Sequence, residues 1–282
     1  MIRRELSPAK LNLHISVLRK REDGYHDIAT LMQKISLYDE MTFSPIKRGI
    51  VVKCPGSSLP ENENNIIYRA AMAIFSYASC ASGIDITIKK KIPVAAGLGG
   101  GSSNAAAALM TINEMFGFHI CTDDLMKIGT KLGADVPFFI YGKTTAWALG
   151  IGDRLHTAGS IPLLWFVLIT PRLEISTQMV YENINLRLTK RTINYTIPQL
   201  QTVKDLLKEL RNDLEEVTLN MHPFLRQLKD LLLKFGALGA LMSGSGPTVF
   251  GLFSDAESAL KAGKALEKSG KGAWSVFVVH SI

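Results

Sequence analysis

Apolar and polar residues alternate along several short stretches of the chain, the pattern that is typical of half-buried β-strands. Residues 84–89 read I-D-I-T-I-K, and residues 11–17 read L-N-L-H-I-S-V. Because successive side chains of a strand point to opposite faces, both stretches predict strands with one buried face. By the same period Lys10 shares the polar face of the earlier strand with Asn12 and His14.

Helical spacing and turn signals divide the rest of the chain. Helices are predicted at residues 65–78, 103–116, 123–132, 203–211, 222–235 and 255–269, and further strands at 144–149, 163–170, 237–242, 248–253 and 274–280. Thr122 is expected to cap the third helix, and Ser254 with Glu257 to form a capping box for the last. Strands and helices segregate in both halves, which predicts an α+β protein with two lobes, residues 1–155 and 156–282. The cleft between the lobes is the expected ligand site.

A glycine-rich run at residues 93–109, P-V-A-A-G-L-G-G-G-S-S-N-A-A-A-A-L, follows a predicted strand and opens a predicted helix. Gly97 and residues 99–101 lack a Cβ atom, so backbone N–H groups there can approach a ligand closely. Residues 102–104 are of the types that cap helices, and the alanines that follow favour helix. Free N–H donors and the positive end of a helix dipole then face one point, which predicts a phosphate site.

Two familiar phosphate loops do not match this run. A Walker A loop requires a lysine after its last glycine, and none follows here. The dinucleotide fingerprint requires a third glycine where Ser102 stands. A flexible Gly/Ser linker is the structural alternative, but the strand before the run and the alanine-rich helix after it favour an ordered loop.

Composition narrows the class of protein. The 282 residues are 47% hydrophobic and 20% charged, which is typical of a globular chain. The 32 basic and 25 acidic residues give a net charge of +7, which suits a polyanionic ligand such as a nucleotide and also permits nucleic acid. Three cysteines without C-x-x-C spacing indicate neither disulfides nor zinc and favour a reducing cytoplasm. The N-terminus lacks the form of a signal peptide, and the most apolar run, residues 161–169, is too short to span a bilayer.

Two side chains are candidates for phosphoryl chemistry. Asp135, in the string L-G-A-D-V-P, lies on a constrained turn between a glycine and a proline, where a carboxylate can accept a hydroxyl proton; an Asx-type turn residue is the alternative. Lys10 can stabilise a carboxylate or a transferring phosphoryl group. Tyr25 and His26 can stack on and hydrogen-bond a flat ring, although packing alone also explains them. The remaining acidic side chains are expected at the surface or at helix caps: Asp23, Asp39, Glu40, Asp123 and Asp124.

Six strings, taken in order, resemble the galactokinase, homoserine kinase, mevalonate kinase and phosphomevalonate kinase (GHMP) superfamily. They are P-A-K-L-N-L at 8–13, R-E-D-G-Y-H at 21–26, N-I-I at 65–67, the glycine loop at 97–104, L-G-A-D-V-P at 132–137 and N-D-L-E at 212–215, with a second glycine loop at 243–247. The strings D-G-Y-H and L-G-A-D-V-P resemble those of one branch of this superfamily. That branch phosphorylates 4-diphosphocytidyl-2-C-methyl-D-erythritol in non-mevalonate isoprenoid synthesis.

The resemblance implies a two-lobed fold, ribosomal-S5-like in the N-terminal lobe and ferredoxin-like in the C-terminal lobe. It implies transfer of the ATP γ-phosphate to the 2-hydroxyl of that substrate, with Asp135 as base and Lys10 as its electrostatic partner. The implied ATP-binding residues are Asn65, Lys90, Pro93, Val94, Ala95, Ala96, Gly97, Leu98, Gly99, Gly100, Gly101, Ser102 and Ser103. Tyr25 and Tyr181 would enclose the cytosine, His26 would read its edge, and Asn12 and Thr177 would contact the rest of the substrate.

The resemblance also implies Mg²⁺, for which Ser103 is the single loop candidate, and no glutamate matches the second ligand of some relatives. It places the enzyme in a bacterial cytoplasm or a plastid stroma, as a monomer or weak homodimer without nucleic-acid or membrane partners. Two other functions stay open. One is another small-molecule kinase of the superfamily, of the mevalonate or homoserine type, and the other is a catalytically silent module that binds nucleotide or nucleic acid.

Overall fold

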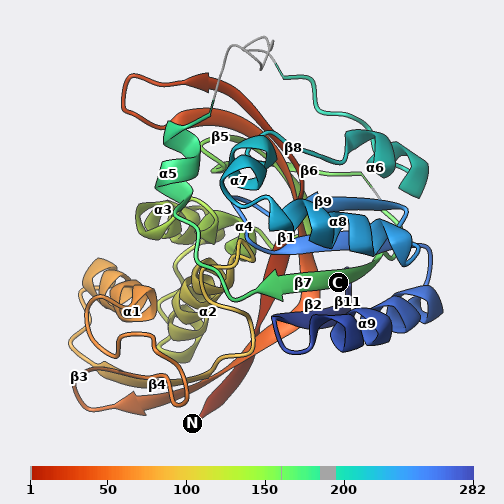
Figure 1. The fold of residues 1–282 in the computed structure, drawn as a ribbon. Coiled ribbons are helices and arrows are strands. Elements are labelled where there is room, and N and C mark those ends of the chain that lie inside the picture. The colour runs from red at the N-terminus through yellow and green to blue at the C-terminus, as the bar shows by residue number, and fades with distance from the viewer. Residues whose placement is uncertain (1, 160, 185–194) are drawn as a thin grey trace. The chain divides into compact units, whose positions relative to one another are not determined.

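The computed structural model describes residues 2–159, 161–184 and 195–282. The chain divides into two compact units, which the sequence interleaves. The first unit comprises Met1–Ala9, Leu37–Val94 and Gly99–Lys143, and the second comprises Lys10–Ser36, Ala95–Leu98 and Thr144–Ile282. Two long strands, β1 (Arg3–Lys20) and β2 (His26–Ile46), pair with each other and contribute residues to both units (Figure 1).

The first unit has a small mixed sheet built on the end of β2. Residues 40–46 of β2 pair antiparallel with β4 (Gly83–Lys89), and β4 pairs parallel with β3 (Gly49–Lys53). Ile84, Ile86 and Ile88 are fully buried while the side chains between them are less so, which confirms the alternation that predicted this strand.

Four helices complete the first unit: α1 (Ile66–Tyr77), α2 (Gly100–Met115), α3 (Thr122–Leu132) and α4 (Val136–Ile140). Helix α2 contacts the other three, and its Ala105–Leu109 segment is buried. Small alanine side chains let the neighbouring helices pack closely against it. The N-terminus of α2 is thereby held by packing on several sides.

The second unit contains a four-stranded antiparallel sheet in the order β11-β7-β10-β9. Its strands are β7 (Trp165–Pro171), β9 (Gly239–Met242), β10 (Val249–Phe253) and β11 (Trp274–His280). In the same unit β1 pairs parallel with β8 (Arg211–Asn212), and β2 pairs antiparallel with β5 (Thr145–Gly150), which also pairs with β6 (Arg154–Thr157).

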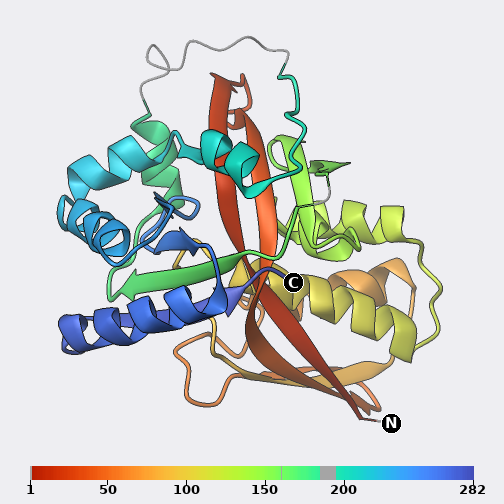
Figure 2. The same ribbon diagram turned by 90° about the vertical axis from the view of Figure 1, so that its right-hand side faces the viewer.

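Two amphipathic helices cover the four-stranded sheet of the second unit (Figure 2). Helix α8 (Phe224–Lys234) buries Leu225, Leu228 and Leu232, and α9 (Ala256–Gly270) buries Ala259, Ala262 and Leu266. These residues recur at helical spacing and join Val167, Ile169 and Phe253 of the sheet in one apolar cluster. Three short helices lie elsewhere in the unit: α5 (Thr177–Glu182), α6 (Val203–Glu209) and α7 (Glu215–Met221).

The predicted α+β class is confirmed, and several predicted boundaries are wrong. Helix α2 begins at Gly100 rather than at residue 103. Cys121 and not Thr122 is the N-cap residue of α3. The N-cap of α9 is Asp255, whose carboxylate accepts from the Ser258 N–H, so the predicted capping box is absent there.

The structure also shows the length of the apolar helices and the state of the cysteines. Across the part of the chain that the structure describes, no helix combines the length and apolarity needed to cross a membrane. All three cysteines are free thiols, as their spacing indicates. Burial raises the pKa of the Cys54 thiol, and a hydrogen bond with Ser82 lowers that of Cys80.

Candidate active site

The first glycine loop ends in a helix N-terminus that no side chain caps. Gly99 is the N-cap residue of α2 and has a left-handed backbone (φ 68°, ψ 14°), and its missing side chain cannot accept from the helix. The Ser103 N–H donates to the Gly99 carbonyl at 2.9 Å, which closes the first turn. The preceding N–H groups have no intrahelical acceptor, so the start of α2 can bind an anion. Residues 102–104, expected to cap the helix, lie within its first turns instead.

The two glycine loops of the sequence meet in the second unit. A Cβ atom at Gly97 (φ +74°) would lie 2.2 Å from the carbonyl oxygen of Ser243, so only glycine fits there. The Ser243 hydroxyl, fully buried, donates to the Gly97 carbonyl at 2.9 Å. The Lys10 N–H donates to the Leu98 carbonyl at 2.9 Å, which ties residues 95–98 to β1 as well.

Lys10 and Asn12 form a buried polar pair on β1. Both side chains are 4% exposed, and the Lys10 ammonium donates to Asn12 Oδ1 through a short hydrogen bond. Asn12 Nδ2 donates to the Thr30 hydroxyl at 2.9 Å, and the Asn12 backbone N–H donates to Ser243 Oγ at 3.2 Å. Thr30 therefore fixes the amide that orients the Lys10 ammonium. The strand period predicted the shared face of Lys10 and Asn12, and the second glycine loop included Ser243, but nothing in the sequence pointed to Thr30 or to the contact of Ser243 with Asn12.

The predicted substrate residues gather in the second unit. The rings of His26 and Tyr181 lie 5.2 Å apart between centroids, with an angle of 32° between their planes. Thr177 and Tyr181 are four residues apart on α5, so they share a face of that helix, and Thr177 Oγ1 lies 2.8 Å from Ser245 Oγ. Burial, with the nearby charge of Lys20, lowers the pKa of His26, which favours the neutral ring.

Tyr25 presents an exposed ring on a fixed backbone. Its side chain is 62% exposed, yet its N–H donates to Asp23 Oδ1 at 3.1 Å and its carbonyl accepts from the Arg21 N–H at 2.8 Å. The Arg21 guanidinium, which hydrogen-bonds the Asp23 carboxylate, lowers the pKa of that carboxyl group. An exposed aromatic ring on a rigid turn is available for stacking on a ligand.

Asp135 lies in the first unit at the start of α4. All five residues of that helix are buried, with Pro137 near its beginning, so the position of Asp135 is rigid. The Asp135 side chain does not cap α4, and its role as catalytic base stays a prediction. An added Cβ at Gly133 would lie 3.7 Å from Ser102 Oγ, so the first turn of α2 lies beside the L-G-A-D-V-P segment.

Two predicted nucleotide residues, Asn65 and Lys90, already have structural partners. Asn65 caps α1: its Oδ1 accepts from the Ile67 N–H at 2.9 Å, and its Nδ2 donates to the Pro60 carbonyl at 2.6 Å. The Lys90 ammonium forms an ion pair with Asp39, which is 0% exposed. The expectation that Asp39 is a surface or capping residue is wrong, because this carboxylate lies in the core. Whether Asn65 and Lys90 also contact ATP stays a prediction.

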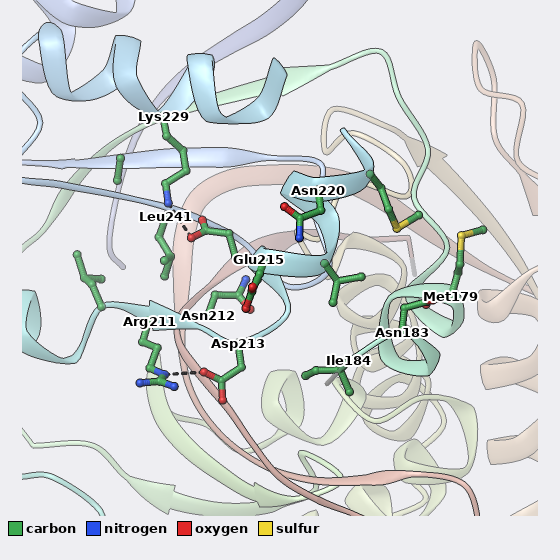
Figure 3. Close-up of a pocket in the computed structure, with 15 residues that line it drawn as sticks. Met179, Asn183, Ile184, Arg211, Asn212, Asp213, Glu215, Asn220, Lys229 and Leu241 are labelled. Atoms are coloured by element: carbon green, nitrogen blue, oxygen red, sulfur yellow. Dashed lines mark hydrogen bonds and ion pairs between the residues drawn. The ribbon is translucent and has the colours of Figure 1, made fainter. Parts of the chain in front are cut away.

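A cavity of about 910 Å³ lies in the second unit, lined in part by Met179 of α5 (Figure 3). Four of its charged side chains have internal partners: Asp213 accepts from Arg211 and from the Val17 N–H, and Glu215 accepts from Lys229 and from the Met242 N–H. None of the predicted catalytic or binding residues lines the cavity. Asn212 lines the cavity and also holds the second glycine loop. Its Nδ2 donates to the carbonyls of Met242 and Gly244 at 2.8 and 2.7 Å.

A Mg²⁺ ion, which the resemblance of the sequence implies, would need oxygen ligands at this site. Among residues 2–159, 161–184 and 195–282, no group of three His, Cys, Asp or Glu side chains could hold a metal ion. Mg²⁺ in kinases is commonly held by only one or two protein oxygens together with the phosphates of the nucleotide. Ser103 Oγ accepts from the Ser7 hydroxyl at 2.7 Å and offers one such oxygen at the start of α2. The residues therefore fit an ion that arrives with ATP rather than one held by the protein alone.

Comparisons with known proteins show the family to which the chain belongs. The model of the GHMP kinases N terminal domain matches residues 65–143, and that of the GHMP kinases C terminal domain matches residues 194–272. The chain is 58% identical to a 4-diphosphocytidyl-2-C-methyl-D-erythritol kinase of Syntrophus aciditrophicus and 50% identical to one of Syntrophotalea carbinolica, over 98% of each chain.

A solved structure of 4-(cytidine 5'-diphospho)-2C-methyl-D-erythritol kinase has a TM-score of 0.84 and 31% identity, over 99% of this chain and 100% of that one. A homoserine kinase from Cytophaga hutchinsonii, at 19% identity and a TM-score of 0.73 over 100% of this chain and 94% of that one, shares the fold. The chain belongs to the GHMP kinases and, within them, to the family of 4-diphosphocytidyl-2-C-methyl-D-erythritol kinases.

Proposed function

We propose that the protein transfers the γ-phosphate of ATP to the 2-hydroxyl of 4-diphosphocytidyl-2-C-methyl-D-erythritol, giving the 2-phosphate and ADP. The observation that carries this acceptor is the pairing of His26 with Tyr181 beside the turn of Tyr25, all within the second unit. A flat base stacks between aromatic rings, and a neutral histidine can read its edge through hydrogen bonds. This set of side chains suits cytosine and has no purpose for mevalonate or homoserine.

In this proposal the start of α2 binds the ATP phosphates through backbone N–H groups. The missing side chain at Gly99 leaves these groups available, and the helix dipole favours the negative charge. Residues 93–103 would form this site, with Asn65 and Lys90 nearer the nucleoside. Mg²⁺, held in part by Ser103, would supply neutralisation of the phosphate charge when bound.

Asp135 would orient the acceptor hydroxyl and accept its proton. The hydroxyl oxygen forms a bond to the γ-phosphorus while the bond from that phosphorus to the β–γ bridging oxygen breaks, and ADP leaves. Lys10, oriented by Asn12, would stabilise the charge that develops on the transferred phosphoryl group. Asn12 and Thr177 would contact the remainder of the substrate.

We also propose a domain division and a cellular location for the enzyme. The domains proposed from the sequence are 1–155 and 156–282. The matched segments 65–143 and 194–272 fall on either side of residue 155, whereas the compact units of the structure interleave along the sequence. A monomer or weak homodimer in a bacterial cytoplasm or plastid stroma follows from the resemblance of the sequence.

The direct test is ADP release from ATP in a coupled assay. We expect turnover with 4-diphosphocytidyl-2-C-methyl-D-erythritol and little with 2-C-methyl-D-erythritol 4-phosphate, mevalonate or homoserine. Turnover with mevalonate or homoserine instead would establish another kinase of the superfamily. Salt-dependent binding of RNA or DNA without ATP turnover would favour a nucleic-acid module.

Two substitutions test the catalytic roles. Asp135→Asn and Lys10→Met should each lower kcat by about 100-fold or more, because proton acceptance and charge stabilisation are lost in the transition state. The KM values for both substrates should change far less. Asp123→Asn, an exposed acid at the start of α3, is the matched control and should keep full activity. Near-normal kcat in folded Asp135→Asn or Lys10→Met would remove the corresponding assignment.

A further inference from the structure

The first unit contains a buried carboxylate that the proposed mechanism does not use. Asp39, on β2, is 0% exposed and accepts from four donors. Its Oδ1 accepts from the backbone N–H groups of Lys91 and Ile92 at 2.8 and 2.9 Å. Its Oδ2 accepts from Asn104 Nδ2 at 3.0 Å and from the Lys90 ammonium through a short ion pair. Burial of a charge is costly without such partners, so this carboxylate is highly constrained.

These donors come from the two segments that flank the first glycine loop. Residues 90–92 directly precede the loop, and Asn104 lies in the second turn of α2, which directly follows it. Lys90 Nζ also donates to Asn104 Oδ1 at 3.3 Å, so the two segments contact each other as well as Asp39. Asp39 therefore fixes both ends of a loop whose own glycines provide no side chains to hold it.

The packing at the start of α2 depends on the same segment. A Cβ at Gly100 would lie 2.9 Å from Ile92 Cγ2 and 3.3 Å from Lys90 Nζ. Gly100 is the first residue of α2, so its N–H is one of the groups that would face an anion bound there. A shift of residues 90–92 would move this N–H, because the segment lies in direct contact with Gly100.

A chain of hydroxyl groups extends the network to Ser103. Asn104 Nδ2 donates to Ser7 Oγ at 3.0 Å, and the Ser7 hydroxyl donates to Ser103 Oγ at 2.7 Å. Because Ser103 Oγ accepts from Ser7, its own proton and its second lone pair remain for another partner. Ser7 and Ser103 are 0% and 2% exposed, so this orientation is shielded from water.

From these contacts we propose that Asp39 is a positioning residue for the phosphate loop, acting through Lys90, Ile92 and Asn104. It sets the geometry of the α2 N-terminus and the orientation of the Ser103 hydroxyl before nucleotide binds. The inference rests on the proposed function in one respect, that the α2 N-terminus is the site of ATP. In this structure the Lys90 ammonium is held by Asp39 and Asn104, so the same contacts would set its proposed place near the nucleoside.

The test compares Asp39→Asn with Glu40→Gln. Glu40 is the next residue on β2 and pairs with Lys89 and Lys91, but its side chain is 43% exposed, so it is a matched control for loss of one carboxylate charge. ATP affinity is measured by calorimetry at a temperature where circular dichroism shows each variant folded. We expect the Kd for ATP to rise about ten-fold or more in Asp39→Asn and to stay within about two-fold in Glu40→Gln. The KM for the alcohol substrate should change little in either variant.

A purely structural role would lower the thermal stability of Asp39→Asn and leave the ATP affinity of the folded protein unchanged, and that result would overturn the proposal. If Asp39→Asn does not fold, Ser7→Ala decides, since it breaks the outer part of the network without uncovering a charge. Wild-type ATP affinity in Ser7→Ala would then overturn the proposal, and an affinity at least about three-fold weaker would support it. ATP binding by the variants is independent of the acceptor, whereas failure of the wild type to phosphorylate 4-diphosphocytidyl-2-C-methyl-D-erythritol would refute only the proposed function.

Discussion

Replacing Gly97 by alanine tests the seating of the two glycine loops on each other. The new Cβ would lie 2.2 Å from the Ser243 carbonyl oxygen, about 0.8 Å inside the 3.0 Å limit that real Cβ contacts essentially never cross. That carbonyl is backbone and accepts from the Gly246 N–H at 3.0 Å, so it cannot move without breaking the second loop. The Ser243 hydroxyl would also lose its acceptor, the Gly97 carbonyl at 2.9 Å.

The expected cost has two parts that a control separates. An alanine at φ +74° costs about 1–2 kcal/mol from its backbone conformation alone. Displacement of a packed backbone adds about 1–3 kcal/mol. Gly56 has the same φ of +74° with nothing within 4 Å of its added Cβ, so Gly56→Ala measures the first part by itself. We therefore expect Gly97→Ala to lose about 2–5 kcal/mol of unfolding free energy and Gly56→Ala about 1–2 kcal/mol.

Urea unfolding measures both free energies, and the coupled ADP assay measures function. Gly97→Ala should also raise the KM for ATP, because residues 95–98 lead directly into the α2 N-terminus, whereas Gly56→Ala should leave it unchanged. If both variants lost the same stability and Gly97→Ala kept the wild-type KM for ATP, the contact between the two glycine loops would have no role in stability or in ATP binding.

Three further substitutions have defined outcomes. Thr30→Val removes the oxygen that accepts from Asn12 Nδ2 and should cost about 1–3 kcal/mol in urea unfolding and lower kcat; an unchanged kcat would show that Asn12 needs no such support. The folded-state pKa of His26 is lowered, so folded protein binds fewer protons there than unfolded protein; wild-type stability should fall as pH drops below about 6.5, and His26→Gln should show a weaker fall. Burial lowers the pKa of Lys34 to about 8, so wild-type stability should rise between pH 8 and 10.5 as folded protein releases this proton before unfolded protein does, and Lys34→Met should lack that rise. The same rise in wild type and Lys34→Met would contradict the last prediction.

The missed strand β2 shows where sequence patterns lose information. Residues 28–35 are buried on both faces, so no alternation of apolar and polar residues marks them. The prediction that its residue Asp39 lies at the surface or at a helix cap was also wrong. A single acidic residue in a sequence suggests a solvated side chain, and only partners far along the chain, such as Lys90 and Asn104, make its burial possible.

Local patterns in the sequence were enough to predict the class of chemistry. Three local features carry this prediction: the glycines at the start of α2, the strand that places Lys10 and Asn12 on one face, and the string around Asp135. Local geometry follows directly from each of them. The strings at residues 21–26 and 132–137 also identified the branch of the family, because they are specific to it.

The groups that hold these features in place became visible only in the folded protein. Ser243, Thr30 and Asp39 act through partners between 18 and 231 residues away in the chain, and no period or motif records such pairs. Their roles depend on burial, since a hydroxyl or carboxylate is committed to a partner only where water cannot replace that partner.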